Sequence, residues 1–355
     1  MPQTSAIIVA GGRCPSQSSS SQSSEHDPER ALACVEVLGE SILERTLDRL
    51  QKHDLVRLDV IAGPIGKLRG RHGLRVTTKA DRKLRWLAAT RALEEHARRG
   101  IDTTLVAELG MYAEFDLQAA LDFHWTRQQT ATPLYDNRGP LAWWIVDPAR
   151  LLSANTLALP FDEDRLPDRP VPYVVGGYTN PLADVHELRQ LIVDAFLGRC
   201  AIAPGGREIK PGVWVDEGAQ VHKSARLVAP AYLGRNSRVH AAAVITRYSN
   251  VERDCSIGEG SVVAGSSILP HTTIGAGLDI TAALVEGGAF VDFSRNVRLT
   301  LRDPLLLASA LPAKADHSAR TRGHEPLRPS MEPDVDYSYL SRAAGRLLEV
   351  FKGEV

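Results

Sequence analysis

The sequence has no apolar run of the roughly 18 residues that a membrane-spanning helix requires. Its first residues also lack a cationic stretch followed by an apolar core, which is the pattern of a secretory signal. We therefore expect a protein that is not exported and has no membrane partner.

An excess of charge of either sign is also missing. The 42 Lys and Arg residues and the 43 Asp and Glu residues leave a formal net charge of -1. A chain so close to neutrality has no general electrostatic attraction to polyanions, so we expect no nucleic-acid partner.

Cysteine is scarce, and the four cysteines are scattered along the chain as Cys14, Cys34, Cys200 and Cys255. They form none of the closely spaced pairs that are typical of zinc sites. Free thiols are typical of a reducing compartment, so we expect a cytoplasmic protein. A disulfide or a zinc site is the alternative.

The sequence does have a six-residue period in its second half. An aliphatic residue recurs at every sixth position, and the register then drops back by one residue on two occasions. This period predicts a parallel β-helix with the aliphatic side chains inside, because a helix would need a period of 3.6 and an ordinary strand a period of 2. Chance spacing in a β-sandwich is the alternative, but a sandwich keeps no integer period over so many steps. The periodic residues are Ile209, Val215, Val221, Leu227, Leu233, Val239, Ile245, Val251, Ile257, Val263, Ile268, Ile274, Ile280, Val285, Val291 and Val297.

This segment resembles the left-handed β-helix of the hexapeptide-repeat proteins. Small residues such as Gly234, Gly258 and Gly275 follow periodic positions, where the chain must turn a tight corner. The resemblance implies a fold that occurs both in acyltransferases and as the C-terminal domain of enzymes that form nucleotide sugars.

The N-terminal part decides between these classes. Residues 5–12 read S-A-I-I-V-A-G-G, an apolar strand whose glycines allow the backbone to approach a phosphate. Residues 31–39 read A-L-A-C-V-E-V-L-G, and residues 41–50 read S-I-L-E-R-T-L-D-R-L, where Ser41 and Glu44 predict a capped helix. This succession is similar to the start of the sugar-phosphate nucleotidyltransferases, which join a nucleoside triphosphate to a sugar 1-phosphate and release pyrophosphate.

The length of 355 residues suggests two domains. We predict a Rossmann-like, GT-A-like α/β nucleotidyltransferase domain over residues 1–200 and a left-handed parallel β-helix over 205–300. A Pro-rich tail with a helix at 337–351 is expected over 301–355. The stretch between 58 and 197 alternates strands with helices. Expected strands are 58–62, 74–78, 103–109, 130–135, 141–146 and 173–178, and expected helices are 83–98, 117–128 and 185–197.

The resemblance also implies where the chemistry lies. Gly11 and Gly12 would hold the triphosphate, with Arg13 and Arg30 as catalytic cations, and Glu108 would hold Mg²⁺, the expected cofactor if the protein is active. The family's glycine-rich loop survives only as Gly11, Gly12 and Arg13, and the Gly-Thr-Arg run that follows it in the family is replaced by Cys14, Pro15 and the serines of the polar stretch 15–27. The family's Pro-Lys pair aligns with Glu29 and Arg30.

The family's second metal-binding Asp is replaced by the uncharged Thr179 and Asn180, and Asn180 is then a candidate substrate-binding residue, while Asp184 is expected to cap the next helix. The expected ligands are a nucleoside triphosphate and a sugar phosphate, or a nucleotide sugar, used for example in polysaccharide biosynthesis by a homo-oligomer.

Two alternatives stay open. A degenerate domain could bind a nucleotide sugar without turnover, as a regulatory or scaffold paralogue that needs no cofactor. The solenoid could instead be an acyltransferase, with a histidine as general base. His222, His240 and His271 are the candidates, and His240 is the preferred one.

Overall fold

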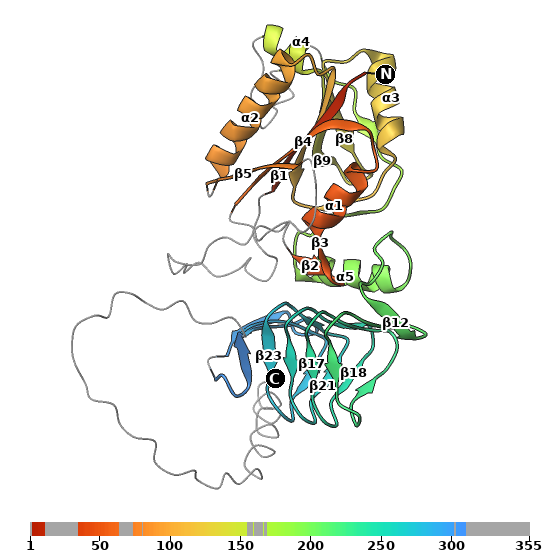
Figure 1. Cartoon of the computed structure of the whole chain (residues 1–355), viewed down its shortest axis with the longest axis vertical. Coiled ribbons are helices and arrows are strands. Elements are labelled where there is room, and N and C mark those ends of the chain that lie inside the picture. The colour runs from red at the N-terminus through yellow and green to blue at the C-terminus, as the bar shows by residue number, and fades with distance from the viewer. Residues whose placement is uncertain are drawn as a thin grey trace, which may run out of the picture. The chain divides into compact units, whose positions relative to one another are not determined.

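The structure is a computed structural model that describes residues 2–10, 35–63, 74–79, 81–154, 159, 166, 169–301 and 303–309. The chain divides into two compact units, Met1–Gly205 and Gly206–Val355 (Figure 1). The serine-rich stretch 15–27 and the predicted helix at 337–351 lie outside the described residues.

The first unit is built on a mixed seven-stranded α/β sheet (Figure 1). Its strand order is β10-β8-β9-β6-β1-β4-β5. The strands β5, β4, β1 and β6 are parallel neighbours, whereas β9 runs antiparallel to both β6 and β8. The bounds are β1 (Thr4–Ala10), β4 (Leu55–Ala62), β5 (Leu74–Thr78), β6 (Thr103–Leu109), β8 (Ala131–Tyr135), β9 (Pro140–Val146) and β10 (Tyr173–Val174).

Five helices begin at polar capping residues among the described residues of this unit. Ser41 and Glu44 form the predicted capping box of α1, and Asp184 caps α5 as predicted. The sequence did not predict α4, and β10 is shorter than the expected strand 173–178. The helices are α1 (Ile42–Leu50), α2 (Arg82–Arg98), α3 (Leu117–Arg127), α4 (Pro148–Ser153) and α5 (Val185–Phe196), and the two small ladders are β2 (Glu36–Val37) with β3 (Glu40–Ser41) and β7 (Tyr112–Ala113) with β11 (Thr179–Asn180).

The helix α2 covers one face of this sheet. Ile7 and Val9 of β1 pack there in one buried cluster with Trp86 and Leu93 of α2. All seven residues of β1 are buried, which explains why this strand is a continuous apolar run in its second half.

The second unit contains three stacked, mostly parallel sheets of short strands, as expected of a β-helix. Each of the four full coils between β13 and β24 contributes one strand to each sheet. The first sheet has β12 (Arg207–Lys210), β13 (Val213–Val215), β16 (Ala231–Leu233), β19 (Ser249–Val251), β22 (Ser267–Ile268), β25 (Ala283–Glu286), β26 (Ala289–Asp292) and β27 (Val297–Thr300). The second has β14 (Gln220–Val221), β17 (Arg238–Val239), β20 (Ser256–Ile257), β23 (Thr272–Ile274) and β28 (Leu307–Ser309), and the third β15 (Arg226–Leu227), β18 (Val244–Thr246), β21 (Val262–Ala264) and β24 (Asp279–Thr281).

The strand register confirms the six-residue repeat. Val215 pairs with Leu233, and Leu233 pairs with Val251, so each coil contains three repeats. Val251 then pairs with Ile268, and Ile268 with Val285, so these later coils are one residue shorter, at the positions where the sequence period drops back.

The two ends of the periodic segment do not form parallel coils. Ile209 lies in β12, which is antiparallel to β13, and Val291 and Val297 lie in β26 and β27, which form an antiparallel hairpin extension beyond β25. The physical reason is the pair Gly287–Gly288, which joins β25 to β26 as a two-residue reversal. The predicted continuation of the solenoid to Val297 is therefore wrong.

Gly258 occupies a corner where the next coil leaves no space for a side chain. A Cβ atom there would lie 2.7 Å from the backbone nitrogen of Ala276 and would also collide with the carbonyl group of Gly275. We expect Gly258→Ala to lower the free energy of unfolding by about 1–3 kcal/mol, because backbone atoms must move to make room. Chemical denaturation measures this effect.

Gly176→Ala is the control, since no atom lies within 4 Å of a Cβ at that position and its φ lies outside the left-handed region that strains an alanine. An equal or larger loss of stability in Gly176→Ala would contradict the proposed close approach at Gly258.

Candidate functional site

The strand order of the first unit reverses beside β1. The chain passes from β1 to β4 and β5 on one side and then returns to β6 on the other side. Ligands of open α/β sheets bind beyond the carboxyl ends of the strands at such a reversal, where the connections leave a crevice. Ala10 lies in register with Ala62 and Leu109, and Ala62 with Thr78, so these four residues mark one edge, the carboxyl edge.

Four predicted site residues follow β1 directly or closely. Gly11, Gly12, Arg13 and Arg30 lie outside the described residues. Their contacts with phosphate therefore stay a prediction, while the strand that leads into them ends at the carboxyl edge.

Glu108 lies at the carboxyl edge, close to the end of β6. It is in register with Val9, so its side chain points to the face that α2 covers. Arg82 of α2 donates through Nε at 3.2 Å and through Nη2 at 3.0 Å to Oε1, and through Nη2 at 3.2 Å to Oε2. A Mg²⁺ ion on Glu108 would lie close to the positive charge of this guanidinium group, and the metal-binding role of Glu108 stays a prediction.

Arg85 brings a second guanidinium group to the same edge. Its side chain is 5% exposed and donates to the Lys79 carbonyl, just beyond β5, over 3.3 Å. Its Nη1 atom also lies beside Gly63, the residue after β4. The sequence analysis did not single out Arg82 or Arg85, because their meaning depends on α2 lying over the ends of β4 and β6.

Asn180 uses its side chain to hold the backbone together. It is buried, its Nδ2 donates to the Glu187 carbonyl over 2.9 Å, and its Oδ1 accepts from the Leu182 amide over 2.9 Å. Both ends of the amide thus connect β11 to the chain around the first turns of α5. The predicted contact of Asn180 with a substrate is not tested by these bonds and stays a prediction.

Asp136 is a carboxylate at the carboxyl edge that the sequence analysis missed. It follows β8, accepts from the Arg138 and Gly139 amides at 2.8 and 3.0 Å, and accepts from the Thr179 hydroxyl at 2.7 Å. Burial raises the pKa of Asp136, but the hydrogen bonds from Thr179 and the two amides lower it by more. The pKa of Asp136 therefore falls below its usual range. The available signal was the turn-forming Asp-Asn-Arg-Gly run between two strands.

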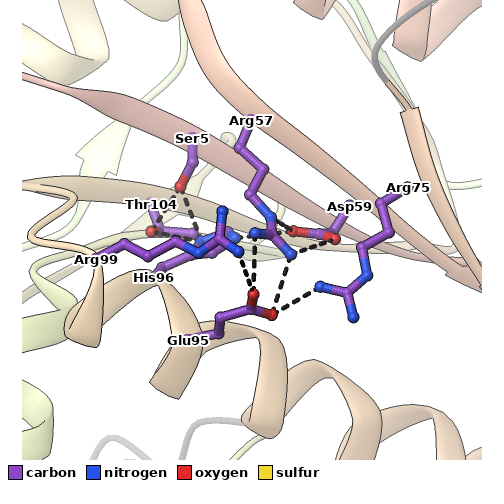
Figure 2. A network of polar contacts seen from close by, with 8 residues as sticks. All are labelled: Ser5, Arg57, Asp59, Arg75, Glu95, His96, Arg99 and Thr104. Atoms are coloured by element: carbon purple, nitrogen blue, oxygen red, sulfur yellow. Dashed lines mark hydrogen bonds and ion pairs between the residues drawn. The ribbon is translucent and has the colours of Figure 1, made fainter.

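A second polar cluster lies nearer the amino ends of the same strands (Figure 2). His96 of α2 contacts Asp59 through Nε2 at 2.8 Å and Ser5 through Nδ1 at 2.9 Å. Ser, His and Asp are the residue types of a hydrolase triad. Ser5 and His96 are both 0% exposed, however, so no substrate can reach the hydroxyl group, and the cluster connects α2 to the sheet.

Ion pairs continue this cluster toward the surface (Figure 2). Arg57 binds Asp59 at 2.6 Å and Glu95 at 3.1 Å, and Glu95 also accepts from Arg75 and Arg99, each at 2.7 Å. Burial raises the pKa of Asp59, but hydrogen bonds from His96 and Arg57 outweigh burial and lower it. The pKa of Glu95 is lowered, first by Arg75 and then by Arg57.

The described part of the chain contains no group of three or more His, Cys, Asp and Glu side chains that could hold a metal ion. Among the helices of that same part, none is long and apolar enough to cross a membrane.

The three solenoid histidines each contact a neighbouring side chain. His222 Nδ1 lies 2.8 Å from Ser224 Oγ, and His240 Nε2 lies 3.2 Å from Ser256 Oγ. Arg253 donates to Nε2 of His271 over 2.9 Å, so that nitrogen cannot also act as a general base. These contacts therefore give no support to the alternative that the solenoid is an acyltransferase.

Comparison with known proteins gives no family. No model of a known protein family matches the chain, and no match is found among curated proteins. The functional proposal therefore depends on the resemblance of the sequence and on the geometry of the carboxyl edge.

Asp59 is expected to stabilise the fold in a pH-dependent manner. We expect Asp59→Asn to lower the free energy of unfolding by about 3 kcal/mol at neutral pH, because it breaks a buried, hydrogen-bonded ion pair. The folded-state pKa lies below the ordinary value of 3.8. The contribution of Asp59 is therefore complete above about pH 4 and is lost as the pH falls through the folded-state value.

Urea denaturation of both proteins over a pH series measures this difference. The gap between the wild type and Asp59→Asn should shrink below about pH 4. Asp54→Asn, at an exposed position before the same strand, is the control and should leave stability nearly unchanged. A gap that stays constant at all pH values would show that the charge of Asp59 is not involved.

Proposed function

We propose that the first unit binds a nucleotide sugar, or the nucleoside triphosphate and sugar 1-phosphate from which one is made, at the carboxyl edge. The reversal of strand order beside β1 is the observation that carries this proposal. The chain continues from that strand into Gly11 and Gly12, which suit close approach of the backbone to a phosphate.

The proposed reaction is that of a sugar-1-phosphate nucleotidyltransferase. A phosphate oxygen of the sugar phosphate attacks the α-phosphorus of the triphosphate, a new P–O bond forms, and pyrophosphate leaves. This step needs positive charge around the phosphates. Arg82 and Arg85 at the carboxyl edge support the proposal, and Arg13 and Arg30 are proposed to add to them.

The cellular setting is part of the same proposal. From the resemblance of the sequence we also propose that the chain belongs to the sugar-phosphate nucleotidyltransferase family. The same resemblance suggests a left-handed solenoid and a homo-oligomer. A cytoplasmic supply of nucleotide sugar for polysaccharide synthesis is the proposed role. The order of the two parts, an α/β sheet followed by a β-helix, supports this view.

A non-catalytic binding protein is the second candidate. The observation in its favour is that Arg82 donates to both carboxylate oxygens of Glu108 and places a positive charge beside them. Both ends of the Asn180 amide are engaged as well. Such a protein would bind the nucleotide sugar as a regulator or scaffold and would release no pyrophosphate.

Two measurements on the full chain test the proposal. Thermal denaturation with a panel of nucleoside triphosphates, nucleotide sugars and acyl-CoA identifies the ligand class, because a ligand of the folded state raises the melting temperature. A coupled assay then measures pyrophosphate release from each triphosphate with sugar 1-phosphates.

We expect a nucleotide or nucleotide sugar to raise the melting temperature. A ligand present at about 100 times its Kd adds about 2.7 kcal/mol to the free energy of unfolding. Pyrophosphate release together with binding selects the transferase, and binding alone selects the regulator. A shift with acyl-CoA only, or with no ligand of the panel, would refute nucleotide binding at this unit.

A further inference from the structure

The first turn of α2 carries an unusual concentration of positive charge. Arg82, Lys83 and Arg85 lie there, and the turn contains no acidic residue. Cations at this position oppose the positive end of the helix dipole. Asp81 already caps the helix by accepting from the Lys83 and Leu84 amides at 2.8 and 3.1 Å. Departures from such a local rule occur at functional sites.

The two arginines reach toward the two strands on either side of β1. Arg82 contacts Glu108 of β6, whereas Arg85 lies beside Gly63, directly after β4. Because β1 lies between β4 and β6, the two guanidinium groups flank the carboxyl end of β1. This is the position at which the strand order reverses.

The geometry of the ion pair leaves one edge of Arg82 for a ligand. Glu108 accepts hydrogen bonds from Nε and Nη2, whereas Nη1 donates no hydrogen bond to a residue that the structure describes. The side chain of Arg82 is 62% exposed, and that of Glu108 is 22% exposed. Glu108 therefore orients the guanidinium group, and the positive charge of Arg82 beside both of its oxygens disfavours a second cation there.

We propose that Arg82, oriented by Glu108 and assisted by Arg85, binds the phosphates of the ligand without a divalent metal ion. This inference rests on the proposed function, since it concerns the same carboxyl edge. A guanidinium group can donate two parallel hydrogen bonds to phosphate oxygens and keeps its charge at every physiological pH. It thereby supplies the positive charge that Mg²⁺ on Glu108 would otherwise bring.

Inorganic tripolyphosphate is the probe, because it carries the phosphates of the ligand without a base or a sugar. Isothermal titration of the full chain in EDTA and in excess Mg²⁺ measures its affinity. We expect binding in EDTA that Mg²⁺ does not strengthen. Arg82→Gln should weaken this binding about 10- to 100-fold, as for the loss of charge-assisted hydrogen bonds.

Two further variants separate the alternatives. Arg91→Gln is the matched control, since Arg91 is an exposed residue of the same helix about 13 Å further along it. It should leave the affinity within about twofold, an allowance for the loss of one distant charge in screening salt. Glu108→Gln removes the charge that orients Arg82 and should change the affinity in EDTA, but it should not make binding depend on Mg²⁺, because the phosphate contacts Arg82 and not a metal on Glu108.

The inference is overturned if tripolyphosphate fails to bind in EDTA, or binds only with Mg²⁺ and loses that binding in Glu108→Gln. Equal losses in Arg82→Gln and Arg91→Gln would also overturn it, since they would show a general charge effect. The proposed function fails separately if tripolyphosphate binds but no nucleoside triphosphate or nucleotide sugar does.

Discussion

The buried contacts of His96 position the helix on which the proposed site depends. His96 contacts Ser5 of β1, Asp59 of β4 and Thr104 of β6, which are three adjacent strands of the sheet. These contacts hold one end of α2 near the amino ends of the strands. The helix then packs on apolar residues of the same face and delivers Arg82 to the carboxyl edge at its other end.

In the second unit, the backbone hydrogen bonds of the strands are formed between successive coils. Each strand pairs with the equivalent strand of the next coil, and the close approach of coils excludes a side chain at Gly258. Buried hydroxyl groups connect successive coils as well: Ser249 and Ser266 donate to the carbonyl groups of Val263 and Ile280. These bonds satisfy buried polar groups that the apolar interior of the solenoid would otherwise leave without a partner.

Local patterns in the sequence predicted the fold class, but they did not predict the contacts that surround Glu108. The six-residue period works because one inward residue per face repeats on every coil, as Leu233 and Val251 do. The period gave a wrong prediction at Val291, because a glycine pair reverses the chain before that residue. A hydrophobic period by itself does not indicate such a reversal. The partner of Glu108 could not be predicted, since Arg82 is distant in sequence and becomes its neighbour only when α2 crosses the sheet. The buried contacts of His96 have the same origin.

Hydrogen–deuterium exchange of the full chain, with and without a saturating nucleotide sugar, tests the central claim most directly. Slower exchange on binding marks the segments that the ligand orders or covers. Binding at the carboxyl edge predicts protection at the ends of β1 and β6 and in the first turn of α2. Protection confined to the solenoid corners that carry His222 and His240, with no change in the first unit, would contradict it.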